Sequence, residues 1–413
     1  MSSFSITETG LSAVETALNA VSDNLANAQT IGFKSQTADF ETLLGQSIGT
    51  TEIGGGVTVS GVTSNFSEGS LNQTGQPLDM AIQGNGFFIY QTSAGQQVFS
   101  RDGQLTLGPN GTLLGPNGYQ LLAYTVQKNG TLGALGPVQI PQSLLAPTAS
   151  TTVSLSGNLN SGDPVIPTTT TINPGNSATY DYSESVTVYD SLGNAHELTF
   201  YFQNNGPDPG NPGDVLWSWT ATLDGSTTGL TNNSGTFDFN SAGAMVIGST
   251  PTNPLTATLT NGAGPLSLGL NFGKITQFAS GDSVSGVADG NAPAGPVSSQ
   301  IGPTGQISVT YSNGQTVPIG QVALATFASN SGLQLTTGGV YAATPSAGAV
   351  AISVPGAGAA GTIVNSSLEQ SNVSVSNQLV NLVVLQNLYG ANAKALQTQD
   401  NVESAIINMP IQP

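Results

Sequence analysis

The sequence has no cysteine and only one histidine, His196. The absence of cysteine excludes disulfides, thiolate zinc sites and cysteine nucleophiles, and a single histidine excludes polyhistidine metal sites. Charge is scarce as well, since 5 basic and 23 acidic residues make up 7% of the chain, against about 25% in an average soluble protein. The net charge of −18 argues against binding to nucleic acid or to anionic membrane surfaces. The chain is therefore poor in the residues that enzymes use.

Long apolar runs are also missing. No segment approaches the about 18–20 apolar residues that span a bilayer, so we expect no membrane insertion. The stretch 1–20 has neither a basic region nor a continuous apolar run, so no Sec-type signal peptide is predicted. A cysteine-free, Lys-poor, Ser/Thr/Gly-rich chain is nevertheless typical of extracytoplasmic proteins. We therefore expect either export without a cleaved signal or residence in the cytoplasm.

Both ends of the chain carry the apolar spacing of helices. Residues recur at intervals of three and four, which places them on one helical stripe. A capping-box spacing at Ser5 and Glu8 predicts a start near residue 5, Gly32 is the expected stop, and Ser366 with Glu369 offers a second capping box. The predicted stripes are Leu11, Val14, Leu18, Val21 and Leu25 at one end and Leu379, Leu382, Leu385, Tyr389, Ala393 and Leu396 at the other.

Each terminal stripe is a narrow seam, which leaves two interpretations open. The helices can pair as a coiled coil that copies from other subunits close around, so that they order on assembly. Alternatively, both are ordinary core-packing helices that lie on a β domain. Helices of this kind depend on burying their stripe in either case.

Between the ends the period changes from helical to two. Apolar and polar residues alternate over 215–223, and two further alternating runs flank a predicted hairpin turn at 190–194. The fold class predicted is mostly β with helical termini. Pro-rich and apolar-poor stretches then suggest domain boundaries. They divide the β region into two domains, one of which is inserted in the sequence of the other. The predicted domains are a terminal helical domain of 1–70 and 365–413, a middle β domain of 71–147 and 286–364, and an inserted β domain of 148–285.

No catalytic arrangement stands out. Gly356, Gly358 and Gly361 match G-x-G-x-x-G, but no helix follows and no acid lies at the required distance, so a dinucleotide site is not expected. His196 is interpreted as a turn or surface histidine, and paired carboxylates cannot be assigned to a site without geometry. We predict no enzyme, no cofactor and no metal. The glycine runs Gly54, Gly55, Gly56 and Gly356, Gly358, Gly361 are interpreted as hinges.

Several longer motifs resemble one family. TGLSA at 9–13 and NLANAQTIGFK at 24–34 resemble the N-terminal signature of bacterial flagellar rod and hook proteins, and LEQSNVS with QNLYGANAK resemble the C-terminal one. PLDMAIQGNGFF and FSRDG are similar to the β domain that this family shares. Ser374, Asn387 and Leu388 depart from the common pattern. The signature residues singled out are Asn27, Thr30, Gly32, Phe33, Lys34, Glu369, Ser371 and Asn372.

Within the family, VYDSLGNAHEL at 188–198 resembles a motif of the outer domain of hook members, and the inserted domain makes the chain longer than distal rod members. The resemblance implies a structural subunit of a curved extracellular tube that joins motor to filament and transmits torque. It implies an inner tube of terminal helices, with the middle and outer β domains around it. The implied partners are the chain itself, rod proteins, hook–filament junction proteins, the hook cap and the type III export apparatus. Three alternatives stay open, namely a distal rod protein, a secreted β-rich adhesin or phage fibre domain, and a hydrolase.

Overall fold

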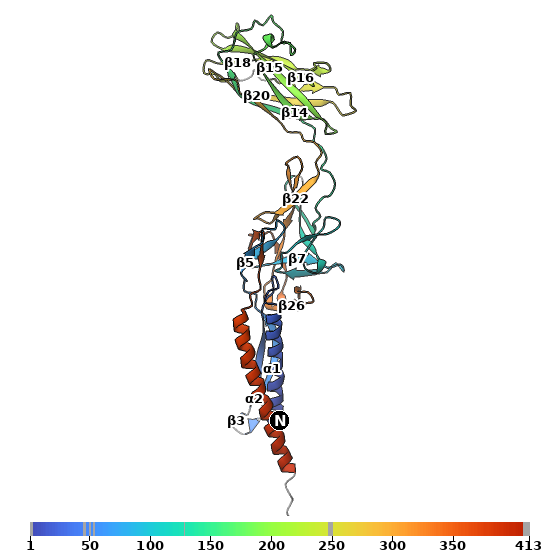
Figure 1. Ribbon diagram of the computed structural model, residues 1–413, viewed down its shortest axis with the longest axis vertical. Coiled ribbons are helices and arrows are strands. Elements are labelled where there is room, and N and C mark those ends of the chain that lie inside the picture. The colour runs from blue at the N-terminus through green and yellow to red at the C-terminus, as the bar shows by residue number, and fades with distance from the viewer. Residues whose placement is uncertain are drawn as a thin grey trace, which may run out of the picture. The chain divides into compact units, whose positions relative to one another are not determined.

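The computed structural model describes residues 3–43, 47–48, 51–52, 54–127, 129–246 and 251–407. The chain divides into two compact units, each traced in Figure 1. Unit 1 comprises 1–142, 297–310 and 316–413, and unit 2 comprises 143–296 and 311–315. Unit 2 is thus an insertion in the sequence of unit 1. The division into three domains is finer than these units and stays a prediction.

Two long helices open and close unit 1. Helix α1 runs over Ser3–Ala26 and helix α2 over Val375–Ile407, and the two lie side by side in Figure 1. This contact between the chain ends confirms the predicted pairing. The capping expectations were wrong, since Ser5 lies inside α1 and Ser366 lies nine residues before α2. Helix α1 also ends before Gly32, because the backbone hydrogen bonds after Asn27 tighten to i→i−3, from the Ala28 amide to the Leu25 carbonyl and from the Thr30 amide to the Asn27 carbonyl.

The rest of unit 1 is built of strands. A 13-stranded sheet has the main order β22-β23-β24-β11-β7-β8-β27-β26, and four two-stranded sheets join β1 to β4, β2 to β3, β6 to β29 and β5 to β30. The strands are β1 Gln36–Thr42, β2 Ser47–Ile48, β3 Thr51–Glu52, β4 Val57–Ser64, β5 Leu71–Gln73, β6 Met80–Gln83, β7 Phe87–Gln91, β8 Gln97–Ser100, β9 Thr106–Leu107, β10 Leu113–Leu114, β11 Gln120–Val126, β12 Leu132–Pro137, β22 Pro296–Ile301, β23 Gln306–Tyr311, β24 Thr316–Val322, β25 Leu324–Thr326, β26 Leu333–Thr336, β27 Val340–Ala343, β28 Ala351–Ser353, β29 Thr362–Asn365 and β30 Ser367–Glu369. Short 3-10 turns occupy Pro116–Gly118, Asn330–Gly332 and Pro345–Ala347.

The C-terminal strands of unit 1 return to its N-terminal half. In the antiparallel pair of β29 and β6, Ile363 lies opposite Ile82, and in the pair of β30 and β5, Glu369 lies opposite Leu71. These pairings bring residues almost three hundred positions apart together. They place Glu369 beside the turn that follows α1, where its backbone carbonyl accepts a hydrogen bond from the amide of Gly32.

Unit 2 consists of two packed sheets. One has the order β17-β19-β20-β13-β21, in which β13 and β20 are parallel, and the other is the antiparallel order β14-β15-β16-β18. A 3-10 turn covers Ser177–Thr179. The strands are β13 Thr152–Asn160, β14 Tyr182–Tyr189, β15 Ala195–Pro207, β16 Val215–Leu223, β17 Leu230–Thr231, β18 Ser234–Phe239, β19 Leu255–Ala257, β20 Leu266–Phe278 and β21 Ser285–Ala288.

Aromatic side chains form the core of unit 2, where the two sheets meet. Phe272 of β20 contacts Phe200 of β15 and Trp219 of β16, with ring centroids 5.7 and 5.2 Å apart. Trp217 and Trp219 are buried while Ser218 between them is partly exposed, as the period of two predicts. The hairpin turn expected at 190–194 is confirmed, since β14 pairs with β15 from Tyr189 opposite Ala195 onward.

Candidate assembly site

Small side chains let α1 and α2 approach closely. The buried face of α1 is formed largely by Ala13, Ala17 and Ala20. A Cβ added at Gly10 would lie 3.4 Å from Nδ2 of Asn392, in van der Waals contact with α2. Packing at this distance gains dispersion contacts along both helices without long side chains between them.

Polar contacts fix the antiparallel register of the two helices. Thr7 donates a hydrogen bond to Oε1 of Gln399 at 3.2 Å, and Asn24 donates to Oε1 of Gln378 at 3.5 Å near the other end of the pair. Asn24 is fully buried and exchanges two hydrogen bonds of 2.7 Å with the backbone of Gln36, the first residue of β1. This asparagine therefore joins the helix pair to the β1–β4 hairpin.

The predicted stripes lie partly on the contact and partly outside it. Val14 and Val21 are buried, and most of the others are half-buried. Leu379 and Tyr389 are 46% and 41% exposed. The role of these stripes in assembly stays a prediction. The half-buried stripe residues are Leu11, Leu18, Leu25, Leu382, Leu385, Ala393 and Leu396.

Helix α2 is apolar on the side that α1 does not cover. A globular helix normally confines its apolar residues to the covered face, and a helix that is apolar all round is normally buried all round. Here the uncovered side carries aliphatic residues over about two turns. Its exposed members, called the outer α2 face below, are Val375, Leu379, Val380 and Val383, while Val384 lines a pocket with Ala17 and Ala20 of α1.

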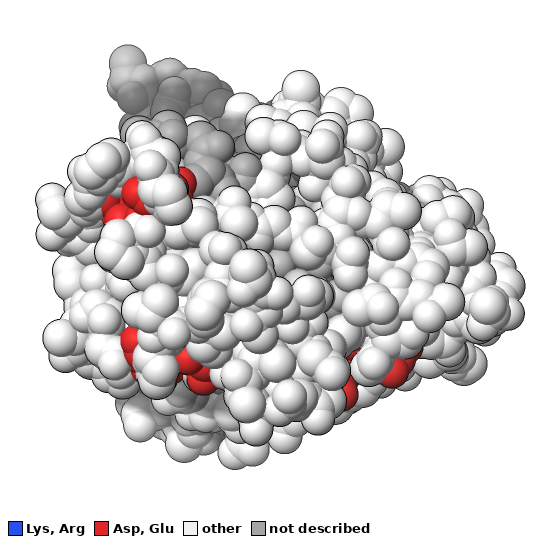
Figure 2. All heavy atoms as spheres, turned by 90° about the horizontal axis from the view of Figure 1, so that it is seen from above, with Lys and Arg blue, Asp and Glu red and all other residues white. Residues whose placement is uncertain are grey.

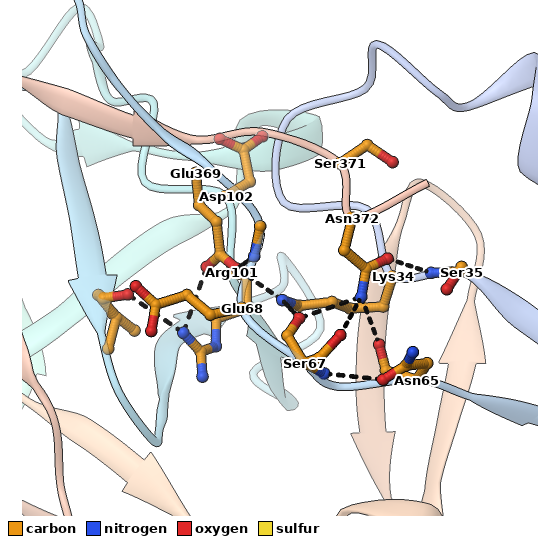
Figure 3. Close-up of polar contacts among 12 residues, drawn as sticks. Lys34, Ser35, Asn65, Ser67, Glu68, Arg101, Asp102, Glu369, Ser371 and Asn372 are labelled. Atoms are coloured by element: carbon orange, nitrogen blue, oxygen red, sulfur yellow. Dashed lines mark hydrogen bonds and ion pairs between the residues drawn. The ribbon is translucent and has the colours of Figure 1, made fainter. Parts of the chain in front are cut away.

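A buried ion cluster lies where the terminal segments meet the β strands of unit 1. Figure 3 shows Lys34 and Arg101 converging on Glu369. The Lys34 ammonium is 2.5 Å from Oε1 of Glu369, and the Arg101 guanidinium is 3.2 Å from Oε2. The side chains of Lys34 and Glu369 are fully buried. Two of the five basic residues of the chain therefore contact one carboxylate.

Further donors and acceptors complete the ion cluster. Gly69 donates its amide to Oε1 of Glu369 at 2.9 Å, and Lys34 also donates to the carbonyl of Ser67 at 2.7 Å. Arg101 donates to the carbonyls of Ile82 and Gly84, beside the β6 strand. Most of the charged atoms thus have hydrogen-bond partners, which burial of an ion pair requires, and Arg101 Nε is buried without one among the described residues.

The structure brings five of the signature residues together. Gly32, Phe33 and Lys34 follow α1, and Glu369 and Asn372 precede α2; Phe33 is buried. The Asn372 side chain accepts from the Ser35 amide at 2.8 Å and donates to the Asn65 and Ser67 carbonyls (Figure 3). The other signature residues act locally: Thr30 donates to Asn27, and Ser371 accepts from the Val373 amide.

Burial affects the titration of two groups here. It lowers the pKa of Lys34, against the opposing effect of Glu369. It raises the pKa of the Asp102 carboxyl, next to Arg101, to about 6, aided by the charge of Asp79 and opposed by the hydrogen bond from the Gln104 amide. A carboxyl whose pKa is raised on folding contributes stability below its unfolded pKa and loses that stability as the pH rises through the folded one.

We therefore expect unit 1 to lose stability as the pH rises from about 4 to about 7. Asp102→Asn should remove this loss, which is on the order of 1 kcal/mol after allowance for solvent screening. Denaturant unfolding followed by circular dichroism at 222 nm measures it, because α1 and α2 both belong to unit 1. An unchanged pH profile in Asp102→Asn would assign the loss to other carboxyls.

Three of the six proposed hinge glycines, Gly55, Gly56 and Gly361, lie in packed or hydrogen-bonded turns. Gly55 and Gly56 are held by two backbone hydrogen bonds to Leu43, and a Cβ at Gly56 would overlap the Thr9 hydroxyl of α1. Gly361 donates to the Asn85 carbonyl at 2.6 Å, and a Cβ there would overlap the Gln83 carbonyl. Gly54, Gly356 and Gly358 have open surroundings, and the last two have φ of +76° and +62°. The hinge role stays a prediction.

Charged groups elsewhere are sparse. On the face in view in Figure 2, acidic side chains form small separate groups and no Lys or Arg is seen. Within the residues that the structure describes, no three His, Asp or Glu side chains are arranged to hold a metal ion. Neither helix, over its described length, is long and apolar enough to cross a membrane.

Four family models match consecutive parts of the chain. Residues 5–34 match "Flagella basal body rod protein" and residues 81–161 match "Flagellar hook protein FlgE/F/G D1 domain". Residues 158–290 match "Flagellar basal body protein FlaE D2 domain", and residues 364–409 match "Flagellar basal body rod FlgEFG protein C-terminal". The first and last of these models include Lys34 and Glu369, the two partners of the buried ion pair.

Full-length relatives agree with these models. The chain is 36% identical to the flagellar hook protein FlgE of Escherichia coli K12, covering 98% of this chain and 99% of that protein. It is 37% identical to the flagellar hook protein FlgE of Salmonella typhimurium, covering 98% and 100%. The fold is similar to the crystal structure of Helicobacter pylori flagellar hook protein FlgE2, with a TM-score of 0.52 at 15% identity, covering 73% of this chain and 99% of that one.

These relatives match along the whole chain and are structural proteins rather than enzymes, so the hydrolase and adhesin alternatives fall away. The hook relatives also include the inserted β region, which favours the hook over the rod. The homopolymer of this family belongs to the extracellular part of the flagellum. The chain belongs to the flagellar hook protein FlgE family and is a structural subunit of the hook.

Proposed function

We propose that copies of this chain assemble through the outer α2 face into a curved tube that couples the rod to the filament and transmits torque. The single observation that carries this is the exposed aliphatic row of α2, which includes Val380 at 63% exposure. Contiguous apolar surface of this kind marks an interaction site in soluble proteins. A second copy is the occupant, because the family forms homopolymers.

The proposed arrangement assigns a layer to each predicted domain. The terminal helices of 1–70 and 365–413 form the inner tube, 71–147 with 286–364 the middle layer, and 148–285 the outer one. The ion cluster supports this arrangement, because it fixes the helix pair to the β strands of unit 1 through Lys34, Arg101 and Glu369. A load on the helices would pass to the strands through these contacts.

The proposed partners follow from membership of the family. Rod proteins would contact one end of the tube and hook–filament junction proteins the other. Subunits would leave through the flagellar type III export apparatus and add beneath the hook cap. The negative charge and the shortage of Lys and Arg are consistent with protein partners rather than nucleic acid.

A charge placed on the outer α2 face should prevent assembly. In cells that lack their own hook protein, we expect Val380→Asp combined with Val383→Asp to leave no hooks in electron micrographs, because a carboxylate cannot be buried unpaired between helices. The matched control is Gln386→Asp, which introduces the same residue at an exposed polar position of the same helix. This control should form hooks.

Secreted protein distinguishes loss of assembly from loss of export or folding. The double variant should appear in the medium as soluble protein with the circular dichroism of the unaltered chain. Normal hooks built from the double variant would refute the role of this face. Straight tubes from the unaltered chain would contradict the curved joint and favour a rod-like role.

A further inference from the structure

His196 lies between two carboxylates in unit 2. It stands at the beginning of β15, where its Nδ1 is 2.7 Å from Oδ2 of Asp224 and its Nε2 is 3.4 Å from Oδ2 of Asp190. Asp190 belongs to the β14–β15 turn, and Asp224 follows the last residue of β16. The histidine side chain is 13% exposed. Both ring nitrogens therefore face an acceptor.

Asp190 organises the loops around this histidine. Its carboxylate is completely buried and accepts from the Leu192 and Asn194 amides, within its own turn. It also accepts from the Asn261 side chain at 2.6 Å, and Gly264 donates to the Ser191 hydroxyl. The loop between β19 and β20 is thereby tied to the β14–β15 turn.

The same turn packs against both segments that connect unit 2 to the rest of the chain. A Cβ added at Gly193 would overlap Pro293 and lie 2.7 Å from Pro147. Tyr189 and Ser150 exchange two hydrogen bonds of 2.9 Å, between the end of β14 and the incoming segment. Any loosening of the turn would therefore reach the incoming segment 143–151 and the outgoing segment 289–296.

We propose that His196 is a pH-dependent clamp at this end of unit 2, holding the β14–β15 turn against the two connecting segments when it is protonated. An imidazolium donates from both nitrogens, so it can bond to Asp224 and Asp190 together. A neutral imidazole donates from one nitrogen only, and the lone pair of its other nitrogen then faces a carboxylate. The clamp belongs to unit 2 alone and does not depend on how copies assemble.

The surroundings of His196 favour the charged form. Burial lowers the pKa of His196, but the hydrogen bonds and charges of Asp224 and Asp190 outweigh it, so the pKa lies above its ordinary value of 6.5. The pKa of Asp190 is held low, because hydrogen bonds from Asn194, Asn261 and His196 outweigh its burial. That of Asp224 is lowered chiefly by His196, again against burial.

The remaining charged neighbour is on the same strand. Glu197 has an exposed side chain, and its amide donates to Oδ1 of Asp224. The stabilisation by the clamp is fully present below pH 6.5 and is lost as the pH rises through the folded pKa of His196. The connecting segments should consequently be held most firmly in mildly acidic surroundings.

The composition of the chain makes the clamp measurable in the full-length protein. His196 is the only histidine, so one imidazole resonance in a proton NMR titration reports its pKa directly. The only two tryptophans, Trp217 and Trp219, both lie in unit 2, so their fluorescence follows the unfolding of that unit. We expect the pKa to lie above 6.5, to fall in Asp224→Asn, and to stay nearly unchanged in the control Glu197→Gln.

Unfolding of the unaltered chain and of His196→Gln gives the energetic test. Between about pH 5.5 and about pH 8.5, the unfolding equilibrium constant of unit 2 should rise about two- to fivefold more in the unaltered chain than in His196→Gln. The carboxyls of unit 2 whose pKa values are raised by burial, Asp163, Asp181 and Asp238, do not bond to His196 and affect both proteins equally, so the difference isolates the histidine. After correction for the intrinsic acceleration of exchange with pH, the protection of the amides in 143–151 and 289–296 should fall at the higher pH in the unaltered chain only.

Three results would overturn the clamp. The first is a pKa of His196 at or below 6.5 in the folded chain, and the second is a pH dependence in His196→Gln equal to that of the unaltered chain. If Asp224→Asn fails to fold, the titration of the unaltered chain and its comparison with His196→Gln still decide the question. The third is a fall in the pKa of His196 that is equal in Glu197→Gln and Asp224→Asn. It would show that the general negative charge around His196, and not its contact with Asp224, raises the pKa.

Discussion

Glu369→Gln should lower the free energy of unfolding of unit 1 by about 3–5 kcal/mol, the usual effect of breaking a buried ion pair from one side. The carboxylate is the common partner of Lys34 and Arg101, and the side chains of Lys34 and Glu369 are fully buried. The amide that replaces it keeps the shape but leaves two buried cations without a counter-charge. Its NH₂ group also faces donors, since Gly69 and Lys34 both donate to Oε1 of Glu369.

The control for this substitution is Glu68→Gln. Glu68 is exposed, accepts one hydrogen bond from the Gly84 amide, and acts on Lys34 through its charge. Removing it should cost less than about 1 kcal/mol, because exposed charges contribute little. Unfolding of unit 1 is followed by circular dichroism at 222 nm. Tryptophan fluorescence, which reports unit 2, should stay unchanged in both variants; equal losses from the two would show that proximity of charge rather than burial matters.

The terminal helices could be predicted from local spacing, but the face that they bury could not. Of the predicted α1 stripe Val14 and Val21 are buried, but Ala13, Ala17 and Ala20, which lie outside the stripe, are buried as well. Hydrophobicity ranks leucine above alanine, whereas close approach of two helices favours the smaller side chain. The partner helix therefore decides the contact face, and a single segment does not contain that information.

The ion cluster shows a different limit of local patterns. Ser366 and Glu369 have capping-box spacing, yet Glu369 lies in β30, paired with β5 nearly three hundred residues earlier. The resemblance to the rod and hook family singled out Lys34 and Glu369 as signature residues, but it did not predict that they form an ion pair. The scarcity of basic residues gives no signal for the cluster either, because Lys274 and Lys394, two of the five basic residues, are exposed.

In unit 2 the alternating pattern was sufficient to predict β strands and the turn at 190–194. The interpretation of His196 as a turn histidine missed its partners, because Asp224 and the Asn261 side chain that bonds to Asp190 come from other loops. Periodicity describes the faces of a strand, but it does not describe which loops meet at the end of a sheet.

Gly32→Ala should also destabilise unit 1 strongly, by about 2–4 kcal/mol. Gly32 has φ +68°, a conformation that costs an alanine about 1 kcal/mol or more. The added Cβ would lie 2.6 Å from the Asp102 amide nitrogen and 2.8 Å from the Arg101 carbonyl carbon. Both are backbone atoms, so the overlap can be relieved only if the turn that carries Arg101 moves.

Gly75→Ala separates the two contributions. Gly75 has nearly the same conformation, φ +73°, but nothing lies within 4 Å of an added Cβ. The loss of stability in Gly75→Ala should therefore be limited to the conformational cost of about 1 kcal/mol. Both variants are measured by denaturant unfolding at 222 nm. If Gly75→Ala loses as much stability as Gly32→Ala, backbone conformation alone accounts for the effect, and the close approach to Arg101 contributes nothing.

A double-mutant cycle then tests whether Gly32 acts through the ion cluster. Gly32 donates its amide to the Glu369 carbonyl at 2.8 Å and packs on the residue that bonds to the Glu369 carboxylate. Displacing the Arg101 turn by Gly32→Ala should already weaken the Arg101–Glu369 contact. The combined loss with Glu369→Gln should therefore be smaller than the sum of the single losses by about 0.5–3 kcal/mol. Strict additivity would mean that the turn after α1 and the ion cluster hold the terminal helices independently.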